Sequence, residues 1–247
     1  MKENTQRLLT WLYPTEGGQD YRANYRQIEH ILPEMSPGGR RSLVHYLSKK
    51  LLVRTERIAG DSFVSLTSHG QSALEAYFPA LDRQRQQWQG EWSVVIFKSG
   101  PKGDPHFRYL RQLLLDNHAF NVSRGVYLYP GTLPSQVLDD CQKIYLGAVL
   151  ILSSQKWVFG DEQTTVNDNY SLLDLVEVYA GISTEINQLL TMKSNQKGLI
   201  EKSTQKIYSV FDRFFNILAN DPGFLHHYYP HVPTAPQLLK QLHLVLN

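Results

Sequence analysis

The chain has 247 residues, a formal net charge of +2 and 42% hydrophobic residues. These values are typical of a globular protein with more than one small domain, and they exclude an intrinsically disordered chain. They also exclude a uniformly basic or acidic protein, so any surface that binds a polyanion must be local. Cys141 is the only cysteine, which rules out an intramolecular disulfide and suits a reducing compartment.

The hydropathy pattern predicts no membrane segment. The first residues hold an apolar run too short for a signal peptide. The longest apolar run, at residues 146–152, has seven residues, whereas a helix that spans a bilayer needs about 20. We therefore expect a cytoplasmic protein without a membrane partner.

The pattern of residues 1–80 predicts three helices, a β-hairpin and a fourth helix. The first two helices are expected in TQRLLTWLYP, capped by Thr5, and in NYRQIEHILPEM. Two strands are expected in LLVRTER and SFVSLTS, with Gly60 at the tip of their hairpin, and a helix follows in SHGQSALEAYF. This order is that of a winged helix-turn-helix domain.

The third helix, at residues 36–51, is the element expected to enter the major groove of DNA. Ser36 is a favourable N-cap, and Pro37 fits the first helical position because its missing N–H costs nothing there. One side of the helix is apolar and the other is mostly polar. The side chains that we expect to contact DNA, on this helix and on the hairpin, are Arg40, Arg41, His45, Ser48, Lys49, Lys50, Arg54 and Arg57.

The charge of this segment differs from that of the whole chain. Between residues 40 and 57 there are six basic residues and one acidic residue, Glu56. Phosphate contacts need such a patch, because the release of condensed counterions supplies much of the affinity. The segment therefore predicts binding to a double-stranded DNA operator. The alternative is a solvated helix face on a domain that is used only for protein contacts.

Residues 88–157 alternate between strand and helix patterns. A buried strand is expected in EWSVVIF, and a helix capped by Asp104 is expected in DPHFRYLRQLLLDNHAF. Two short strands follow in NVSRGVYLYPG, then a helix in LPSQVLDDCQKI and a strand in LGAVLIL. The order β-α-β-β-α-β is that of a ferredoxin-like domain.

Residues 158–247 predict a helical domain. Two helices are expected, in DNYSLLDLVEVYAGISTEINQLL and in STQKIYSVFDRFFNILAN. The aromatic stripe of this domain favours a core position. The alternative is a pocket for an apolar acyl group, which would be lined by Tyr179, Tyr208, Phe211 and Phe215.

Three histidines lie close together in FLHHYYPH, at positions 226, 227 and 231. Three histidines can bind zinc, but adjacent histidines point in different directions, and the spacing matches no metal motif. Nucleophile motifs, phosphate loops and dinucleotide fingerprints are also missing from the sequence. We therefore expect no metal and no cofactor.

Three segments resemble the phenylacetic-acid degradation repressor (PaaX) family. Its middle domain resembles GEWSVVIF, the helix that carries Arg108 and Arg111, and FNVSRGVYLYPG. Its N-terminal arginine-containing helix resembles RRSLVHYLSKKLLV, with Leu51 where a glycine is usual. Its C-terminal motif resembles ILANDPGFLHHYYPHVPTAPQLLKQL, with Phe224 and Leu225 in place of a Leu-Pro pair.

The resemblance implies an α+β protein and a function in transcription. It implies a winged helix-turn-helix domain at 1–80, a ferredoxin-like domain at 88–157 and a helical domain at 158–247. It further implies a homodimeric repressor that an acyl-coenzyme A thioester releases from DNA. Arg108 and Arg111 are cations available for the phosphates of such an effector.

A second interpretation is a nucleic-acid-processing enzyme built on the ferredoxin-like domain, because the family's middle domain is similar to a small nuclease. Such nucleases hold a metal with an aspartate at the end of the first strand. This chain has Lys98 near that position, and a lysine cannot ligate Mg²⁺. We therefore expect no catalytic residues and no enzyme activity.

Overall fold

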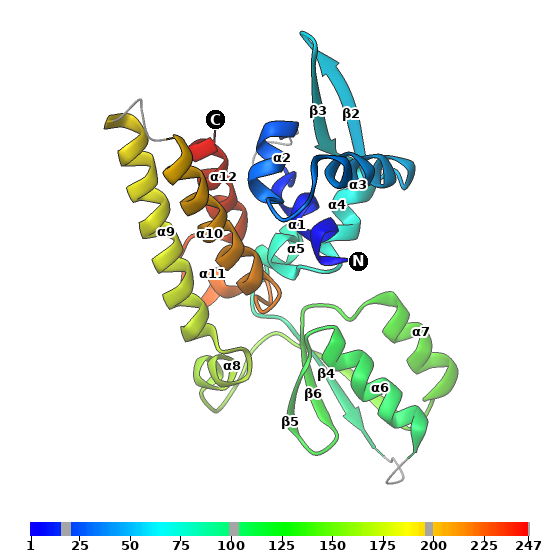
Figure 1. The fold of residues 1–247 in the computed structure, drawn as a ribbon. Helices are drawn as coiled ribbons and strands as arrows, with labels where there is room; N and C mark the ends of the chain where they lie inside the picture. The colour runs from blue at the N-terminus through cyan, green and yellow to red at the C-terminus, as the bar shows by residue number, and fades with distance from the viewer. Residues whose placement is uncertain (16–20, 99–103, 196–199, 247) are drawn as a thin grey trace. The chain divides into compact units, whose positions relative to one another are not determined.

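The structure, a computed structural model, has a mixed α+β architecture (Figure 1). Its strands form two separate antiparallel sheets. None of the helices in the described stretches has the length and apolar character needed to cross a membrane. The structure describes four stretches of the chain, residues 1–15, 21–98, 104–195 and 200–246.

The chain divides into two compact units. Residues 1–86 and 172–247 form one of them, called unit 1 below. Residues 87–171 form the other, called unit 2. The first and last thirds of the sequence thus build one unit together, and unit 2 is an insertion between them.

The first part of unit 1 combines helices with a small sheet of order β1-β3-β2. The sheet was expected to have two strands, but the three residues of β1 also pair with β3, with Arg22 opposite Ser65. The elements in chain order are α1 (Glu3–Trp11), β1 (Arg22–Asn24), α2 (Tyr25–Ile31), α3 (Pro37–Lys49), β2 (Val53–Ile58), β3 (Asp61–Leu66), α4 (Ser68–Glu75), the 3₁₀ helix η1 (Pro79–Leu81) and α5 (Arg83–Gln86).

Local sequence explains where two of these helices begin. Asn24 and Gln27 form a capping box at the start of α2. The Ser36 hydroxyl accepts a hydrogen bond from the Gly39 N–H at the start of α3, as the sequence predicted. The expected cap of α1 was wrong, because Thr5 lies in its first turn and the helix begins at Glu3.

The predicted hairpin stands at one end of unit 1 (Figure 1). β2 and β3 pair from Val53 opposite Leu66 to Ile58 opposite Asp61. Ala59 and Gly60 make the turn with φ of 52° and 94°. Positive φ at both positions is typical of a two-residue type I′ turn, which matches the twist of the two strands.

The end of α3 has an unusual residue. The Leu52 N–H donates to the Leu47 carbonyl and the Leu51 N–H donates to the Ser48 carbonyl, each at 3.0 Å, which is the hydrogen-bond pattern of a Schellman motif. This motif requires a left-handed residue, and Leu51 supplies it with φ of 58°. A side chain with a Cβ is strained in this conformation, so the motif stores free energy that a glycine would release.

Replacing Leu51 with glycine is expected to raise the free energy of unfolding by about 0.5–1 kcal/mol. Relief of the left-handed strain outweighs the greater backbone freedom of glycine in the unfolded chain. The Leu51 side chain is 70% exposed, so its removal loses little packing. Urea unfolding of the two proteins measures the difference. Leu51→Ala, which keeps the strain, should not share the gain; equal gains in both variants would contradict this explanation.

The second part of unit 1 consists of helices that pack on the first part. They are α9 (Leu172–Asn195), α10 (Ile200–Leu218), α11 (Leu225–Tyr228) and α12 (Ala235–Leu246). The helix expected from residue 168 onward is interrupted at Ser171, where φ is 50°. The rings of Trp11 and Phe211 meet edge to face at 5.3 Å, which joins α1 to α10. The α1 side chain of Arg7 also pairs with Asp212 of α10 at 2.5 Å.

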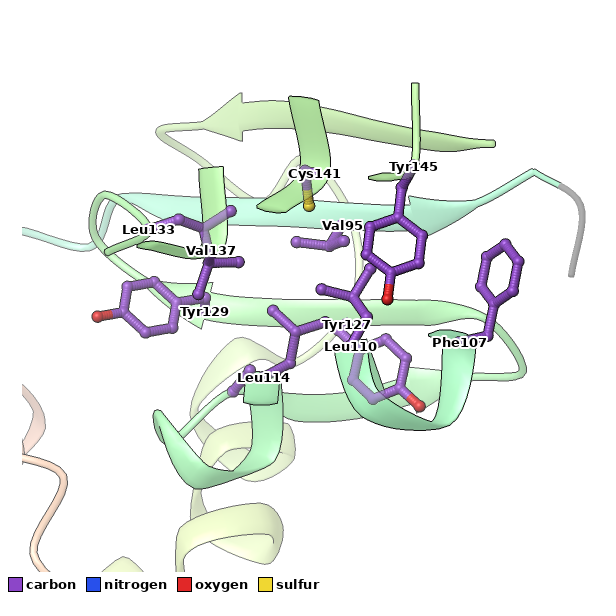
Figure 2. Packing of buried hydrophobic residues seen from close by; sticks show 11 residues of the cluster. Val95, Phe107, Leu110, Leu114, Tyr127, Tyr129, Leu133, Val137, Cys141 and Tyr145 are labelled. Carbon is purple, nitrogen blue, oxygen red and sulfur yellow. The ribbon is translucent and has the colours of Figure 1, made fainter. Parts of the chain in front are cut away.

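Unit 2 has a four-stranded sheet of order β5-β6-β4-β7, with every neighbouring pair antiparallel. Two helices, α6 (Pro105–Asp116) and α7 (Ser135–Ile144), pack on one face of this sheet (Figure 2). Val95 and Tyr127 of the strands are buried in one hydrophobic cluster with Leu110 and Val137 of the helices (Figure 2). The elements of unit 2 are β4 (Trp92–Phe97), α6 (Pro105–Asp116), β5 (Phe120–Ser123), β6 (Val126–Pro130), α7 (Ser135–Ile144), β7 (Val149–Ser154) and α8 (Glu162–Tyr170).

Candidate nucleic-acid interface

The exposed side of α3 carries a row of polar and basic side chains. Arg41, His45 and Lys49 follow one another at intervals of four residues, which places them along one side of a helix. All three are exposed, whereas Val44 and Leu47 on the opposite side are buried. The helix contains no acidic residue. This side of α3 is therefore a positively charged strip that a phosphate backbone or a base edge could approach.

Arg40 does not belong to this strip. It is only 5% exposed, and its guanidinium donates to the carbonyls of Leu32 at 3.2 Å and Met35 at 2.6 Å. It also forms an ion pair with Glu29 of α2 at 2.7 Å. These contacts fix α3 against α2 and the loop between them. Arg40 was expected to contact DNA, but its position makes it a structural residue.

Other side chains extend the strip toward the end of the helix. Lys50 is exposed at the C-cap and Ser48 is half-buried. Tyr46, which the sequence analysis did not select, is 54% exposed beside His45. A tyrosine offers both a ring for apolar contacts and a hydroxyl for a hydrogen bond. Its alternation with basic residues on an exposed helix is the signal that could have identified it.

The two arginines of the hairpin lie on opposite faces, because they are three residues apart on one strand. Arg57 shares its face with Val53, which is buried against the helices, and Arg57 itself is exposed. Arg54 lies on the other face, where its Nε is 3.0 Å from the Ser65 hydroxyl and 3.3 Å from the Glu56 carboxylate. Part of the Arg54 charge is therefore balanced by the Glu56 carboxylate on that exposed face of the sheet.

Glu56 also pairs with a cation that the sequence analysis missed. Its carboxylate lies 3.4 Å from the guanidinium of Arg22 on β1. Arg22 reaches Glu56 across the sheet because β1 pairs with β3, which in turn pairs with β2. No local pattern predicted β1, so no local signal could have placed Arg22 beside the hairpin.

The aromatic residues suggested for an acyl pocket fill the interior of unit 1. Tyr179 and Phe211 have no exposed surface, Phe215 is 6% exposed, and Tyr208 is half-buried. The rings of Phe211 and Phe215 pack at 6.4 Å. The expectation of a core position therefore fits this geometry, and an open slot for an acyl chain does not.

Tyr179 forms a buried hydrogen bond with Asp221. Its hydroxyl donates to Asp221 Oδ2 at 2.7 Å, and the Gly223 N–H donates to Asp221 Oδ1 at 2.8 Å. Burial raises the pKa of the Asp221 carboxyl above its usual range. The cavity beside this pair has free space for about one water molecule, so it cannot take an acyl group.

The two arginines suggested for the effector phosphates belong to unit 2. Arg108 and Arg111 are exposed on α6, and the Arg111 guanidinium lies 5.9 Å from the centre of the Phe97 ring. The four aromatic residues suggested with them belong to unit 1.

No metal site is found in the described part of the chain, where no group of three or more histidine, cysteine, aspartate or glutamate side chains could hold an ion. His226 Nδ1 lies 3.2 Å from the Val232 carbonyl, a contact that holds the loop after α11. Lys98 is exposed immediately after β4. Residues 99–103, which follow it, lie outside the described residues.

Similarity to known proteins is found among solved structures alone. No family model matches the chain, and no curated protein matches it. Among solved structures, the chain is similar to an uncharacterized protein, Rv0674 from Mycobacterium tuberculosis, with a TM-score of 0.40 and 15% sequence identity. That similarity covers 96% of this chain and 90% of the other.

Proposed function

We propose that the protein is a DNA-binding transcriptional regulator in which residues 1–80 form a winged helix-turn-helix domain. The observation that carries the proposal is the exposed side of α3, which holds Arg41, His45 and Lys49 and no acid. The order of helices and strands and the antiparallel β2–β3 hairpin support the fold part of the proposal. In such domains the third helix enters the major groove and the hairpin lies along the backbone.

Unit 2 fits the role of a ferredoxin-like scaffold in this proposal. Its strand order, β5-β6-β4-β7, and its two helices on one face of the sheet support that assignment. We further propose a homodimer, because two copies of α3 could then read the two halves of an inverted repeat. The resemblance to PaaX repressors favours repression and release by an acyl-coenzyme A thioester. The filled interior around Phe211 gives that last part no support.

Arg41→Ala is expected to reduce sequence discrimination at one base pair by roughly 1–3 kcal/mol, because an arginine in the major groove can pair with a guanine through two hydrogen bonds.

Arg57→Ala is expected to weaken binding to all sequences alike. It is also expected to lower the slope of log affinity against log salt concentration by about one unit. An operator selected from random duplexes, and versions of it with single base changes, provide the measurement by fluorescence anisotropy.

Arg83→Ala is the matched control, since Arg83 is an exposed arginine on a different helix, α5, of the same unit. This control should bind as the unsubstituted protein does. If Arg41→Ala and Arg57→Ala also bind every duplex as the control does, α3 and the hairpin do not form a DNA interface.

A further inference from the structure

Unit 2 carries a basic cluster of its own, which consists of Lys98, Arg108, Arg111 and Arg124. These residues gather around the end of β4. Lys98 follows Phe97, the last residue of that strand, and the Phe97 N–H donates to the Gly125 carbonyl at 2.7 Å. That hydrogen bond holds the β5–β6 turn, and with it Arg124, beside the strand end. The Arg111 guanidinium lies 5.9 Å from the Phe97 ring centre, and Arg108 lies one turn earlier on the same flank of α6.

The cluster has little compensating negative charge. All four cations are exposed. Two described carboxylates contact α6. Asp104 accepts a hydrogen bond from the His106 N–H at 2.8 Å as the cap of this helix, and Asp140 of α7 accepts one from the Tyr109 hydroxyl at 3.0 Å. The exposed residues of β5 beside the turn, Asn121 to Ser123, are uncharged. The end of this sheet therefore presents a net positive surface in a chain whose net charge is only +2.

The form of the cluster favours an extended ligand. Its cations lie on three separate elements around the rim of the sheet, and none of them is buried in a pocket. A small anion is held best by donors that converge in a closed site, whereas a phosphate backbone is bound by cations spread along an exposed surface. Arginines on a rigid helix and a tight turn also lose little freedom when they bind phosphate.

We propose that the unit 2 basic cluster binds the phosphate backbone of double-stranded DNA. It contacts phosphates other than those bound by unit 1, and it reads no sequence. This inference rests on the proposed function, since it adds a second, sequence-independent contact to the same operator complex. Its consequence is that affinity depends on the length of the duplex beyond the base pairs that α3 contacts.

The test uses the full-length protein with the double variant Arg108→Glu/Arg124→Glu. Fluorescence anisotropy measures binding to a duplex of roughly 10 base pairs, one helical turn, and to a duplex of roughly four turns that contains the same base pairs. The double variant is expected to bind the long duplex roughly tenfold or more weakly, with a salt slope lower by about two units, and to bind the short duplex unchanged. Lys156→Glu is the control, because this exposed lysine follows β7, whose last residue pairs with the start of β4 at the other end of the sheet. Its binding to both duplexes should follow that of the unsubstituted protein.

The outcomes separate this inference from the proposed function. Unchanged binding of the long duplex by the double variant, alongside weakened binding by Arg41→Ala, overturns the inference and leaves the proposed function intact. Weakened binding of the long duplex by the double variant, alongside unchanged binding by Arg41→Ala, supports the cluster and overturns the assignment of α3 as a DNA-contacting helix. A melting temperature that rises with coenzyme A in the unsubstituted protein only, with unchanged DNA binding by the double variant, would assign the cluster to a nucleotide instead.

A near-native melting temperature of the double variant verifies that it is folded. The single variant Arg124→Glu, in the β5–β6 turn, provides a milder version of the same test.

Discussion

Replacing Phe211 with alanine is expected to lower the free energy of unfolding by about 3–5 kcal/mol. The side chain has no exposed surface, and its ring lies between Trp11 at 5.3 Å and Phe214 and Phe215 at 6.4 Å. Its loss leaves a cavity at the place where α10 meets α1. A domain of this size is stable by about 5–15 kcal/mol, so the change removes a large part of the total.

Urea unfolding monitored by circular dichroism measures the effect of Phe211→Ala. Leu173→Ala on α9 is the control, because Leu173 is 57% exposed and its replacement should change stability by no more than about 0.5 kcal/mol. A loss of less than about 1 kcal/mol in Phe211→Ala would contradict the core assignment. It would restore the acyl-pocket interpretation, for which a panel of acyl-coenzyme A compounds should then raise the melting temperature.

Acidification is expected to destabilise the protein through His243. His243 is 4% exposed, its Nε2 lies 2.8 Å from the Trp11 carbonyl, and its ring stacks on Tyr21 at 3.5 Å. Burial lowers the pKa of His243 to about 3, although the hydrogen bond to Trp11 opposes this shift. Below about pH 6.5, the pKa of His243 in the unfolded chain, the unfolded chain binds a proton at this residue that the folded protein does not bind. The stability that His243 contributes is therefore present above about pH 6.5 and is lost as the pH falls toward 3. At pH 4 the free energy of unfolding is expected to be lower by about 3 kcal/mol than at neutral pH.

Comparison with a variant isolates this contribution from other groups. Asp221 acts in the opposite direction, because its raised pKa favours the folded state in acid. His243→Gln keeps an N–H donor but cannot titrate, so its stability should fall much less between pH 7 and pH 4. His227→Gln replaces an exposed histidine and should keep the full pH dependence. A His243→Gln protein that loses as much stability in acid as the unsubstituted protein would refute the assignment.

The parts of the fold that the sequence predicted are those that local chemistry determines. Ser36 and Pro37 mark the start of α3 because capping and proline geometry act within one turn. Gly60 marked the hairpin because a tight turn needs positive φ. The strand β1 was missed because its three residues have no pattern of their own and form a strand only through β3. The break at Ser171 was missed because no glycine or proline marks it.

In the candidate site, too, the sequence predicted what helical spacing determines and missed what depends on contacts between elements. Arg41, His45 and Lys49 were selected correctly as exposed residues because helical spacing predicts a shared side. Arg40 was placed with them on composition alone, although its spacing to Val44 and Leu47 put it on the buried side of α3. Closer use of the same periodicity would have separated the two arginines. The ion pair of Arg40 with Glu29 depends on how α2 and α3 cross, which no pattern within either helix specifies.

The pairing of Trp11 with Phe211 and His243 has a consequence for synthesis of the protein. The partners of α1 are encoded at the far end of the chain, and His243 follows Trp11 by 232 positions. A ribosome that adds about 5–20 residues per second needs roughly 10–30 s to proceed from residue 86 to the end of α12. During that interval the nascent first segment carries the apolar surface of Trp11 and Phe78 without the side chains of α10 and α12 that pack on these residues. The first segment of unit 1 therefore gains its full apolar packing only after the last helix, α12, has been made.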